Sequence, residues 1–322
     1  MAARPEPAFP ELVELPNVTV AEFDPLLEQE IGAWRQRFDW DFRPSAELLR
    51  RFLQVRSLYG YALRVGRSMV GYAYHVCEGR KGLIGDFYVQ REYAEPAHEM
   101  MLLGAAVQGL MLVPGVHRIE CQLLLLQNPA VQSFPFSRSL KRYDRYFMEV
   151  GRDAARTLRP KEPAFRVGFL PFAERFKEEI AQLVTAAYRG HVDSEINDQY
   201  RTIPGARHFL MNITQFPGCG HFSPKASVVA VDPGSGRLCG ACLTSLVSNT
   251  SGHVTQLCVL PGIRGAHVGY ELLRQSLQRL IELGCESISL TVTRSNLDAI
   301  RLYESIGFRA ASVFPALVWE GF

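Results

Sequence analysis

The chain has 322 residues, enough for two ordinary domains or one large domain. Hydrophobic residues make up 47% of it and charged residues 21%, a balance typical of globular proteins with a sizeable core. The 35 basic and 33 acidic residues nearly cancel. This balance gives no support to a nucleic-acid partner or a polybasic membrane surface, so we expect neither.

The N-terminal stretch MAARPEPAFPELVELP is proline-rich and acidic and lacks the apolar segment of a secretory signal. The longest apolar stretch, Met100–Val116, is interrupted by Gln108 and is too short to span a bilayer, so it predicts a buried helix. We therefore expect a cytoplasmic protein without a membrane segment. Its oligomeric state is left open.

Two halves of the chain follow one plan. Residues 61–76 predict a β-hairpin that turns at Gly66, and residues 227–247 predict a second hairpin with a longer turn. In each half a third strand, a loop, a helix and a further strand follow. The first half has its third strand at Leu83–Val89 and its helix at Ala97–Leu112, and the second half begins with a strand at Phe165–Leu170, a helix at Ala173–Tyr188 and, later, a strand at His253–Val259.

The spacing between matching landmarks is nearly constant. Gly71 and Gly240 are 169 residues apart, Val89 and Val259 are 170 apart, and Ile119 and Ile288 are 169 apart. A tandem duplication explains this offset. We predict an α/β fold of two tandem mixed-sheet domains, residues 1–150 and 163–322, joined by a charged, proline-containing segment.

Seven cysteines are scattered along the chain. Cys239 and Cys242 form the one close pair, and no second pair or nearby histidine completes a zinc set. Both fall in a predicted strand, where positions three apart point to opposite faces. We interpret them as reduced core thiols and expect no metal.

The stretch LCVLPGIRGAHVGYELL, residues 257–273, predicts a strand, a glycine-marked loop and the start of a helix. Unpaired backbone N–H groups at a helix N-terminus suit a phosphate, and Arg264 adds a charge. A plain helix entry is the alternative. The glycine spacing fits neither a Walker A loop nor a dinucleotide fingerprint.

A second motif, TRSNLDAIRLYESIGF, follows one strand later. Together the two motifs resemble the GNAT superfamily of acetyl-CoA-dependent N-acetyltransferases. The resemblance covers Val259-Leu260-Pro261, the loop Arg264–Gly269, and Asn296 through Phe308, and it is best over residues 165–322. The tandem arrangement is similar to that of mycothiol synthase-like proteins.

The resemblance implies two GNAT-type domains, acetyl-CoA as co-substrate and direct attack of an amine on its thioester. It implies that Tyr303 protonates the departing thiolate, although a core tyrosine is the alternative. Asn296 would bond the pantetheine arm or simply cap its helix. The implied cofactor-binding residues are Leu257, Cys258, Val259, Arg264, Gly265, Ala266, His267, Val268, Gly269, Tyr270 and Asn296.

Two features depart from the family pattern. His267 stands where the loop usually has its first glycine, and a histidine takes a positive φ less easily than glycine. The first half lacks the loop glycines and offers Glu92, Glu95 and Glu99 instead, which we expect to repel a pyrophosphate. We therefore predict that residues 1–150 are a degenerate copy, and that one CoA binds per chain.

The segment YRGHVDSEINDQYRT offers Asp193, Glu195 and Asp198 as acceptor-binding carboxylates, with a solvated acidic loop as the alternative. The sequence identifies no general base. We predict an N-acetyltransferase acting on a primary amine of a small molecule or peptide. The alternative is a non-catalytic acyl-CoA-binding or scaffold protein that kept the fold.

Overall fold

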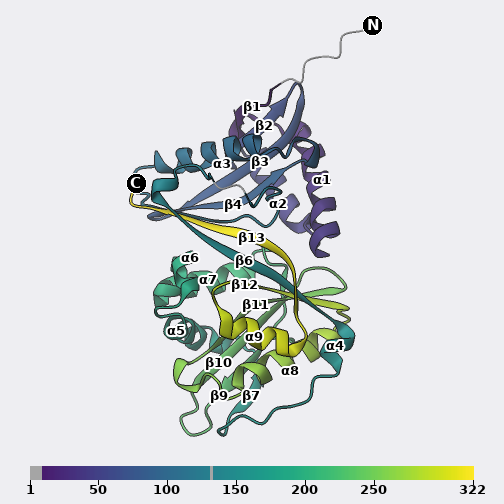
Figure 1. The fold of residues 1–322 in the computed structure, drawn as a ribbon, viewed down its shortest axis with the longest axis vertical. Coiled ribbons are helices and arrows are strands. Elements are labelled where there is room, and N and C mark those ends of the chain that lie inside the picture. The colour runs from purple at the N-terminus through teal and green to yellow at the C-terminus, as the bar shows by residue number, and fades with distance from the viewer. Residues whose placement is uncertain (1–8, 131–132) are drawn as a thin grey trace. The chain divides into compact units, whose positions relative to one another are not determined.

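The computed structural model describes residues 9–130 and 133–322. The chain forms two compact units. Unit 1 takes the described residues of 1–38, 42–144 and 313–322, and unit 2 takes 39–41 and 145–312. Both units combine helices with a mixed sheet (Figure 1), which confirms the predicted α/β class.

Unit 1 has a sheet in the order β1-β2-β3-β4-β5-β13. Its elements are β1 (Glu11–Glu14), α1 (Val20–Phe38), α2 (Arg43–Gln54), β2 (Tyr59–Val65), β3 (Ser68–Glu78), β4 (Lys81–Val89), α3 (Pro96–Met111), β5 (Arg118–Gln122) and the ends of β6 (Leu140–Gly151) and β13 (Arg309–Glu320). Short 3-10 turns are η1 (Leu15–Asn17), η2 (Arg91–Tyr93) and η3 (Ser137–Ser139). Helix α3 covers one sheet face, where Leu102, Leu103 and Ala106 pack into an apolar core.

Unit 2 has the order β6-β12-β11-β10-β9-β7, with β8 beside β10. Its elements are α4 (Arg152–Arg156), β7 (Gly168–Pro171), η4 (Glu174–Phe176), α5 (Lys177–Ala187), α6 (Val192–Ile196), η5 (Asp198–Arg201), α7 (Ile203–Gln215), β8 (His221–Phe222), β9 (Val228–Val231), β10 (Leu238–Leu246), β11 (Ser251–Val259), η6 (Pro261–Ile263), α8 (Val268–Glu282), β12 (Ser287–Thr293) and α9 (Leu297–Ile306). Helices α8 and α9 build a core on one sheet face, and α5 and α7 build one on the other.

The duplication extends to the irregularities of the sheets. In the β3–β4 ladder Tyr74 faces Asp86 and His75 faces Ile84, so Gly85 is left unpaired as a bulge. In the β10–β11 ladder the same irregularity leaves Thr255 unpaired, 170 residues later. A bulge conserved at this offset indicates that both units are copies of one fold.

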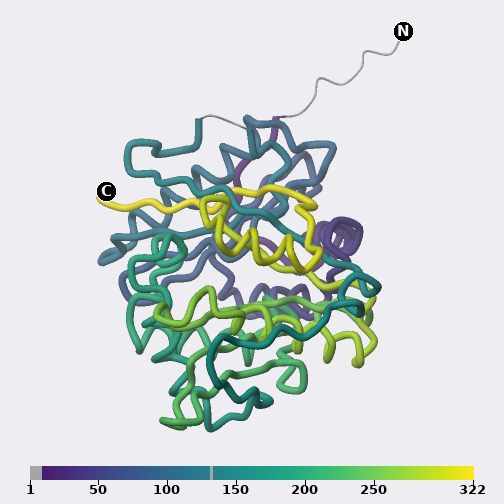
Figure 2. Tube along the Cα trace, turned by 60° about the horizontal axis from the view of Figure 1, so that its bottom comes forward, coloured from purple at the N-terminus to yellow at the C-terminus, as the bar shows by residue number. Residues whose placement is uncertain are grey.

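The unit boundaries differ from the predicted domain limits of 1–150 and 163–322. Strand β13 follows α9 directly (Figure 2), yet its last residues pair with β5 of unit 1. Residues 145–151 of β6 pair with β12, and residues 39–41 belong to unit 2. Pairing between strands far apart in sequence decides which unit these segments belong to, and the spacing of residues along the chain does not reveal that pairing.

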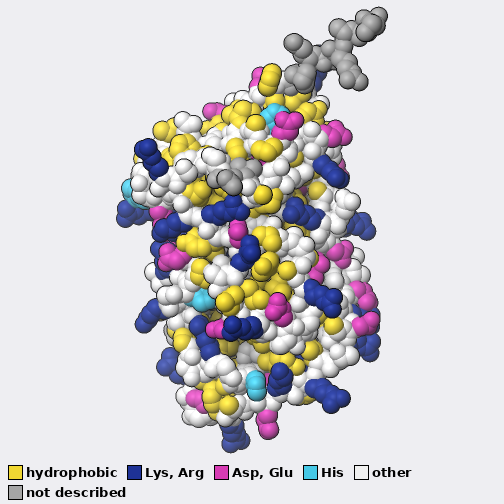
Figure 3. Space-filling model, viewed as in Figure 1, with side chains coloured by type: hydrophobic (Ala, Val, Ile, Leu, Met, Phe, Trp, Pro, Cys, Tyr) yellow, Lys and Arg dark blue, Asp and Glu magenta, His cyan; other side chains and the backbone are white. Residues whose placement is uncertain are grey.

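Both cysteines of the close pair are buried strand residues, as predicted, but they pack into one core cluster and not on opposite faces, because the β9–β10 ladder is irregular between Leu238 and Gly240. Burial raises the pKa of Cys242 to about 12 and also raises that of Cys239, so both thiols stay protonated. Within the described residues no cluster of histidine, cysteine or acidic side chains has the geometry to hold a metal ion. In the same residues no helix combines the length and apolar character that crossing a membrane requires. Basic and acidic side chains are interspersed over the face shown in Figure 3.

Candidate active site

The β11–β12 pair opens at one end. The two strands run parallel, and their pairing ends at Val254 and Leu290 although β11 continues to Val259. The Leu260 N–H donates to the Cys239 carbonyl at 2.9 Å, so the backbone of β11 alternates from there between its two edges. By this alternation the backbone N–H and C=O groups of Cys258 point toward β10, whereas those of Leu257 and Val259 point toward the open edge.

Side-chain chemistry at Cys258 is unfavourable for nucleophilic attack. The thiol is buried, and this burial raises its pKa to about 12, with a smaller contribution from Cys242. A thiol that remains protonated is a poor nucleophile. Cys258 is therefore a buried strand thiol.

The loop after β11 leads into α8, whose first turn has no side-chain cap. Gly265 and His267 both have left-handed backbone conformations, with φ of 79° and 64°. His267 is the N-cap of α8, and no side chain caps the helix. The first-turn N–H groups of Val268, Gly269 and Tyr270 consequently lack intrahelical partners, which is the geometry that binds anions.

Arg264, which we expect to contact a phosphate, also makes a contact within unit 2. Its guanidinium donates to the Ala187 carbonyl at 2.5 Å, at the C-terminus of α5. A cation at a helix C-terminus satisfies a carbonyl and complements the helix dipole. The contact fixes the loop onto α5.

Asn296 and Tyr303 belong to α9. The Asn296 side chain accepts from the Ala299 N–H at 3.3 Å and caps the helix. Tyr303 is 8% exposed and packs edge-on against Phe308. Burial, and then the nearby Asp193 carboxylate, raise the pKa of Tyr303, so its hydroxyl is protonated at neutral pH.

Asp193 is hydrogen-bonded to Thr293, the last residue of β12. The Thr293 hydroxyl donates to the Asp193 carboxylate, and the Asp193 backbone N–H donates to Nδ1 of His191 at 3.1 Å. After burial, the Asp193 charge is the next cause that raises the pKa of both Tyr188 and Tyr200. The Asp193 charge thus acts on the hydroxyls of three tyrosines.

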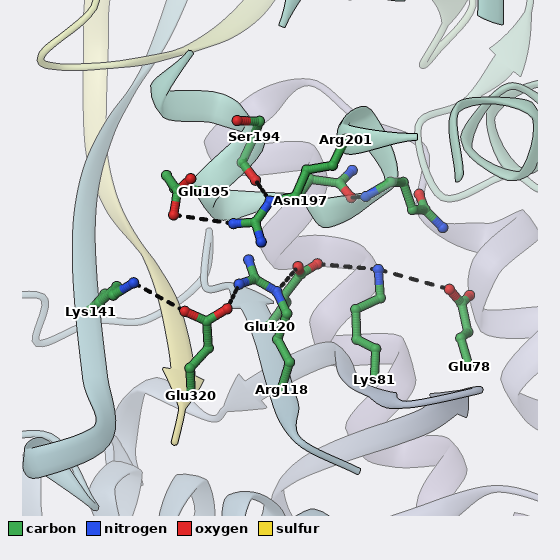
Figure 4. Close-up of polar contacts among 11 residues, drawn as sticks. Glu78, Lys81, Arg118, Glu120, Lys141, Ser194, Glu195, Asn197, Arg201 and Glu320 are labelled. Carbon is green, nitrogen blue, oxygen red and sulfur yellow. Dashed lines mark hydrogen bonds and ion pairs between the residues drawn. The ribbon is translucent and has the colours of Figure 1, made fainter. Parts of the chain in front are cut away.

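The other two predicted carboxylates behave differently. Glu195 forms an ion pair with Arg201 at 3.1 Å, and the Arg201 Nε also donates to the Ser194 carbonyl (Figure 4). Asp198 lies in η5. Asp193 has a hydrogen bond to the end of β12, and its charge acts on Tyr303.

Sequence reasoning missed a hydrogen-bonded chain next to the open edge. Gln256 donates to the Tyr188 hydroxyl at 2.7 Å, and that hydroxyl contacts the Leu257 carbonyl at 3.4 Å. The Tyr200 hydroxyl donates to the other end of Gln256 at 3.4 Å. One signal was available, because Gln256 is a polar residue inside the predicted strand His253–Val259, and its 4% exposure in the structure requires partners.

Comparisons with known proteins agree with this geometry. Residues 193–308 match the model of the acetyltransferase (GNAT) family. A segment of 57 residues is 33% identical to the N-alpha-acetyltransferase MAK3 of Arabidopsis thaliana, and it covers 18% of this chain and 30% of that protein. The chain therefore spans less than a third of the length of this relative.

Solved structures match across both units. A GCN5-related N-acetyltransferase from Sphaerobacter thermophilus has a TM-score of 0.62 at 15% identity and covers 99% of this chain and 97% of its own. A tandem GNAT protein from the clavulanic acid biosynthesis pathway has a TM-score of 0.56 at 13% identity, over 97% and 98% of the two chains. These matches show that the chain has the fold of two GNAT-type domains.

Proposed function

We propose that this chain, whose residues 193–308 match the acetyltransferase (GNAT) family model, is an N-acetyltransferase whose active site is in unit 2 and whose acyl donor is acetyl-CoA. One observation carries the proposal. The open β11–β12 edge and the uncapped α8 N-terminus follow each other in one stretch of chain, and they suit the amide-bearing arm and the phosphates of one extended cofactor.

The proposed reaction is a direct transfer. The acceptor amine attacks the thioester carbonyl carbon, a C–N bond forms, and the C–S bond breaks. Backbone N–H groups at Leu257 and Val259 stabilise the developing oxyanion. The thiolate leaves and takes a proton from the Tyr303 hydroxyl, while the amine loses its proton to water or to a nearby base.

Asp193 gives the acceptor site its charge. A carboxylate that accepts from the Thr293 hydroxyl favours a cationic group, and primary amines are protonated at neutral pH. We propose that Asp193 binds the acceptor as its ammonium form before the proton leaves. This role fits a small amine and a peptide N-terminus equally.

The corresponding loop of unit 1 differs from the loop that we propose to bind CoA in unit 2, and this difference supports placing the active site in unit 2. Glu99 stands at the position that the 170-residue offset equates with Gly269. Its buried carboxylate accepts from the backbone N–H groups of Gln127 and Asn128, at 2.8 and 3.2 Å. The Gln127 amide in turn donates to the Val89 carbonyl at 2.9 Å. The chain itself thus occupies, in unit 1, the positions that we propose for CoA in unit 2.

The test uses the full-length chain. We expect acetyl-CoA to bind in calorimetry and a panel of primary amines to include acceptors whose acetylation releases free thiol. Asp193→Asn should raise KM for the amine and leave the Kd of acetyl-CoA unchanged. The exposed Asp153→Asn variant is the matched control.

Two results would contradict the proposal. Absence of acetyl-CoA binding would rule out the whole assignment. Binding without transfer to any amine would favour the non-catalytic acyl-CoA-binding protein instead.

A further inference from the structure

A segment outside the family match lies along the start of α8. The strap, which we define as Arg159–Ala164, connects α4 to β7. The Tyr270 hydroxyl donates to the Arg159 carbonyl at 2.9 Å, and the Ala164 N–H donates to the Ala266 carbonyl at 3.2 Å. Both ends of the strap are therefore attached to the loop and first turn that we propose to hold the CoA phosphates.

A buried carboxylate fixes the middle of the strap. The Lys161 backbone N–H donates to Glu271, which is 3% exposed. Arg274 donates to the same carboxylate from two nitrogens, at 2.8 and 2.9 Å. Because Arg274 balances the charge of Glu271, this carboxylate does not set a negative potential at the helix start.

His267 supplies a further attachment. Its Nδ1 lies 3.3 Å from the Glu162 carbonyl, a hydrogen bond when the proton is on Nδ1. A left-handed conformation is unfavourable for a residue that carries a Cβ. The strap contact offsets part of this cost and gives a physical reason for a histidine where the family has glycine.

Lys161 places a cation at the helix start. Its Nζ lies 4.3 Å from the centroid of the Tyr270 ring, and Tyr270 is the third residue of α8. The Lys161 side chain is exposed. Arg264, the cation expected for this role, has its guanidinium on the Ala187 carbonyl instead.

We propose that the strap is part of the CoA-binding site and that Lys161 binds a CoA phosphate beside the N-terminus of α8. The inference rests on the proposed function, because it assigns a residue to the same site. It also goes beyond it, since the strap precedes residues 193–308 and has no counterpart in the motifs.

The experiment measures binding of CoA and of 3′-dephospho-CoA to the full-length chain by calorimetry at low ionic strength. A charge-assisted hydrogen bond is worth about 1.5–3 kcal/mol, so Lys161→Ala should weaken CoA binding roughly tenfold or more. Lys161→Arg should keep most of the affinity. Lys225→Ala, at another exposed lysine of unit 2, is the matched control.

The two ligands separate the two phosphate sources. If Lys161→Ala weakens CoA but not 3′-dephospho-CoA, Lys161 binds the 3′-phosphate. If both ligands lose affinity alike, it binds the pyrophosphate. Equal CoA affinity of Lys161→Ala and Lys225→Ala, with wild-type binding intact, overturns this inference alone, whereas a wild-type chain that binds no CoA overturns the proposed function with it.

Discussion

At the scale of single residues, Tyr303 has the properties that a general acid needs. It is nearly buried, its pKa is raised by burial and by Asp193, and no hydrogen bond among the described residues uses its hydroxyl. Tyr303→Phe keeps the ring and its packing against Phe308 but removes the proton. We expect turnover to fall roughly 10²–10⁴-fold with the melting temperature nearly unchanged.

Steady-state kinetics across pH would check this. The control is Tyr59→Phe at an exposed tyrosine of unit 1. Equal turnover of Tyr303→Phe and wild type at every pH would make Tyr303 a packing residue.

Unit 1 contains a buried acid whose effect on stability depends on pH. Glu30 accepts from the Trp34 indole at 3.1 Å and from the Tyr72 hydroxyl at 2.7 Å. Burial, followed by repulsion from Asp86, raises the pKa of Glu30 well above its ordinary value of 4.5. The folded chain therefore retains a proton that the unfolded chain loses as pH rises through 4.5.

Because the folded chain then binds more protons than the unfolded chain, the free energy of unfolding should fall as pH increases above 4.5. In Glu30→Gln the amide oxygen still accepts from Trp34, the amide N–H donates to the Tyr72 oxygen, and the Tyr72 hydroxyl donates to Asp86. We expect the variant to lose less stability between pH 5 and pH 8 in urea denaturation. A steeper loss than in wild type would contradict the protonated state of Glu30.

Some roles of single residues could be predicted from the sequence, and some contacts of single residues could not. The motifs identified Tyr303, Asn296 and the loop because each occupies a fixed place in a local pattern. The partners of Arg264 and Glu99 were not predictable in this way. Arg264 meets the end of α5, 77 residues away, and Glu99, which was expected to repel a pyrophosphate, is buried against residues 127–128.

At the scale of elements, the two copies share a bulge and an opening between strands. In unit 1 the β4–β5 pairing ends at Ile84 and Cys121, matching the end of the β11–β12 pairing at the same offset. The hairpins and the duplication were predictable because they are local and repeated. What fills the opening was not, since the contacts of Gln127 and Glu99 lie between elements.

These contacts predict one CoA per chain. Opening unit 1 to a pantetheine arm would break the Gln127–Val89 hydrogen bond and leave the buried Glu99 carboxylate without its backbone donors, at a cost of several kcal/mol. Titration of the full-length chain with acetyl-CoA should give a stoichiometry of one. A value of two would mean that the loop at residues 127–128 yields to the ligand.

At the scale of the whole molecule, neither unit is one continuous stretch of the sequence, and this changes which fragments can fold. Residues 145–151 of β6 form the outer partner of β12, and Met148 and Val150 are 1% and 2% exposed in the core of unit 2. Residues 39–41 add an Asp39 contact to Ser251 and a Trp40 ring against His253. A fragment of residues 163–322 lacks all of these.

We therefore expect the 163–322 fragment to be unfolded or only partly folded. Each lost large core side chain is worth about 2–5 kcal/mol, and a domain has only about 5–15 kcal/mol in total. Circular dichroism should show a broad or absent thermal transition and calorimetry no acetyl-CoA binding. A fragment of residues 145–312 restores β6, so it should recover part of the transition. A cooperative, ligand-binding 163–322 fragment would show that β12 does not need its β6 partner.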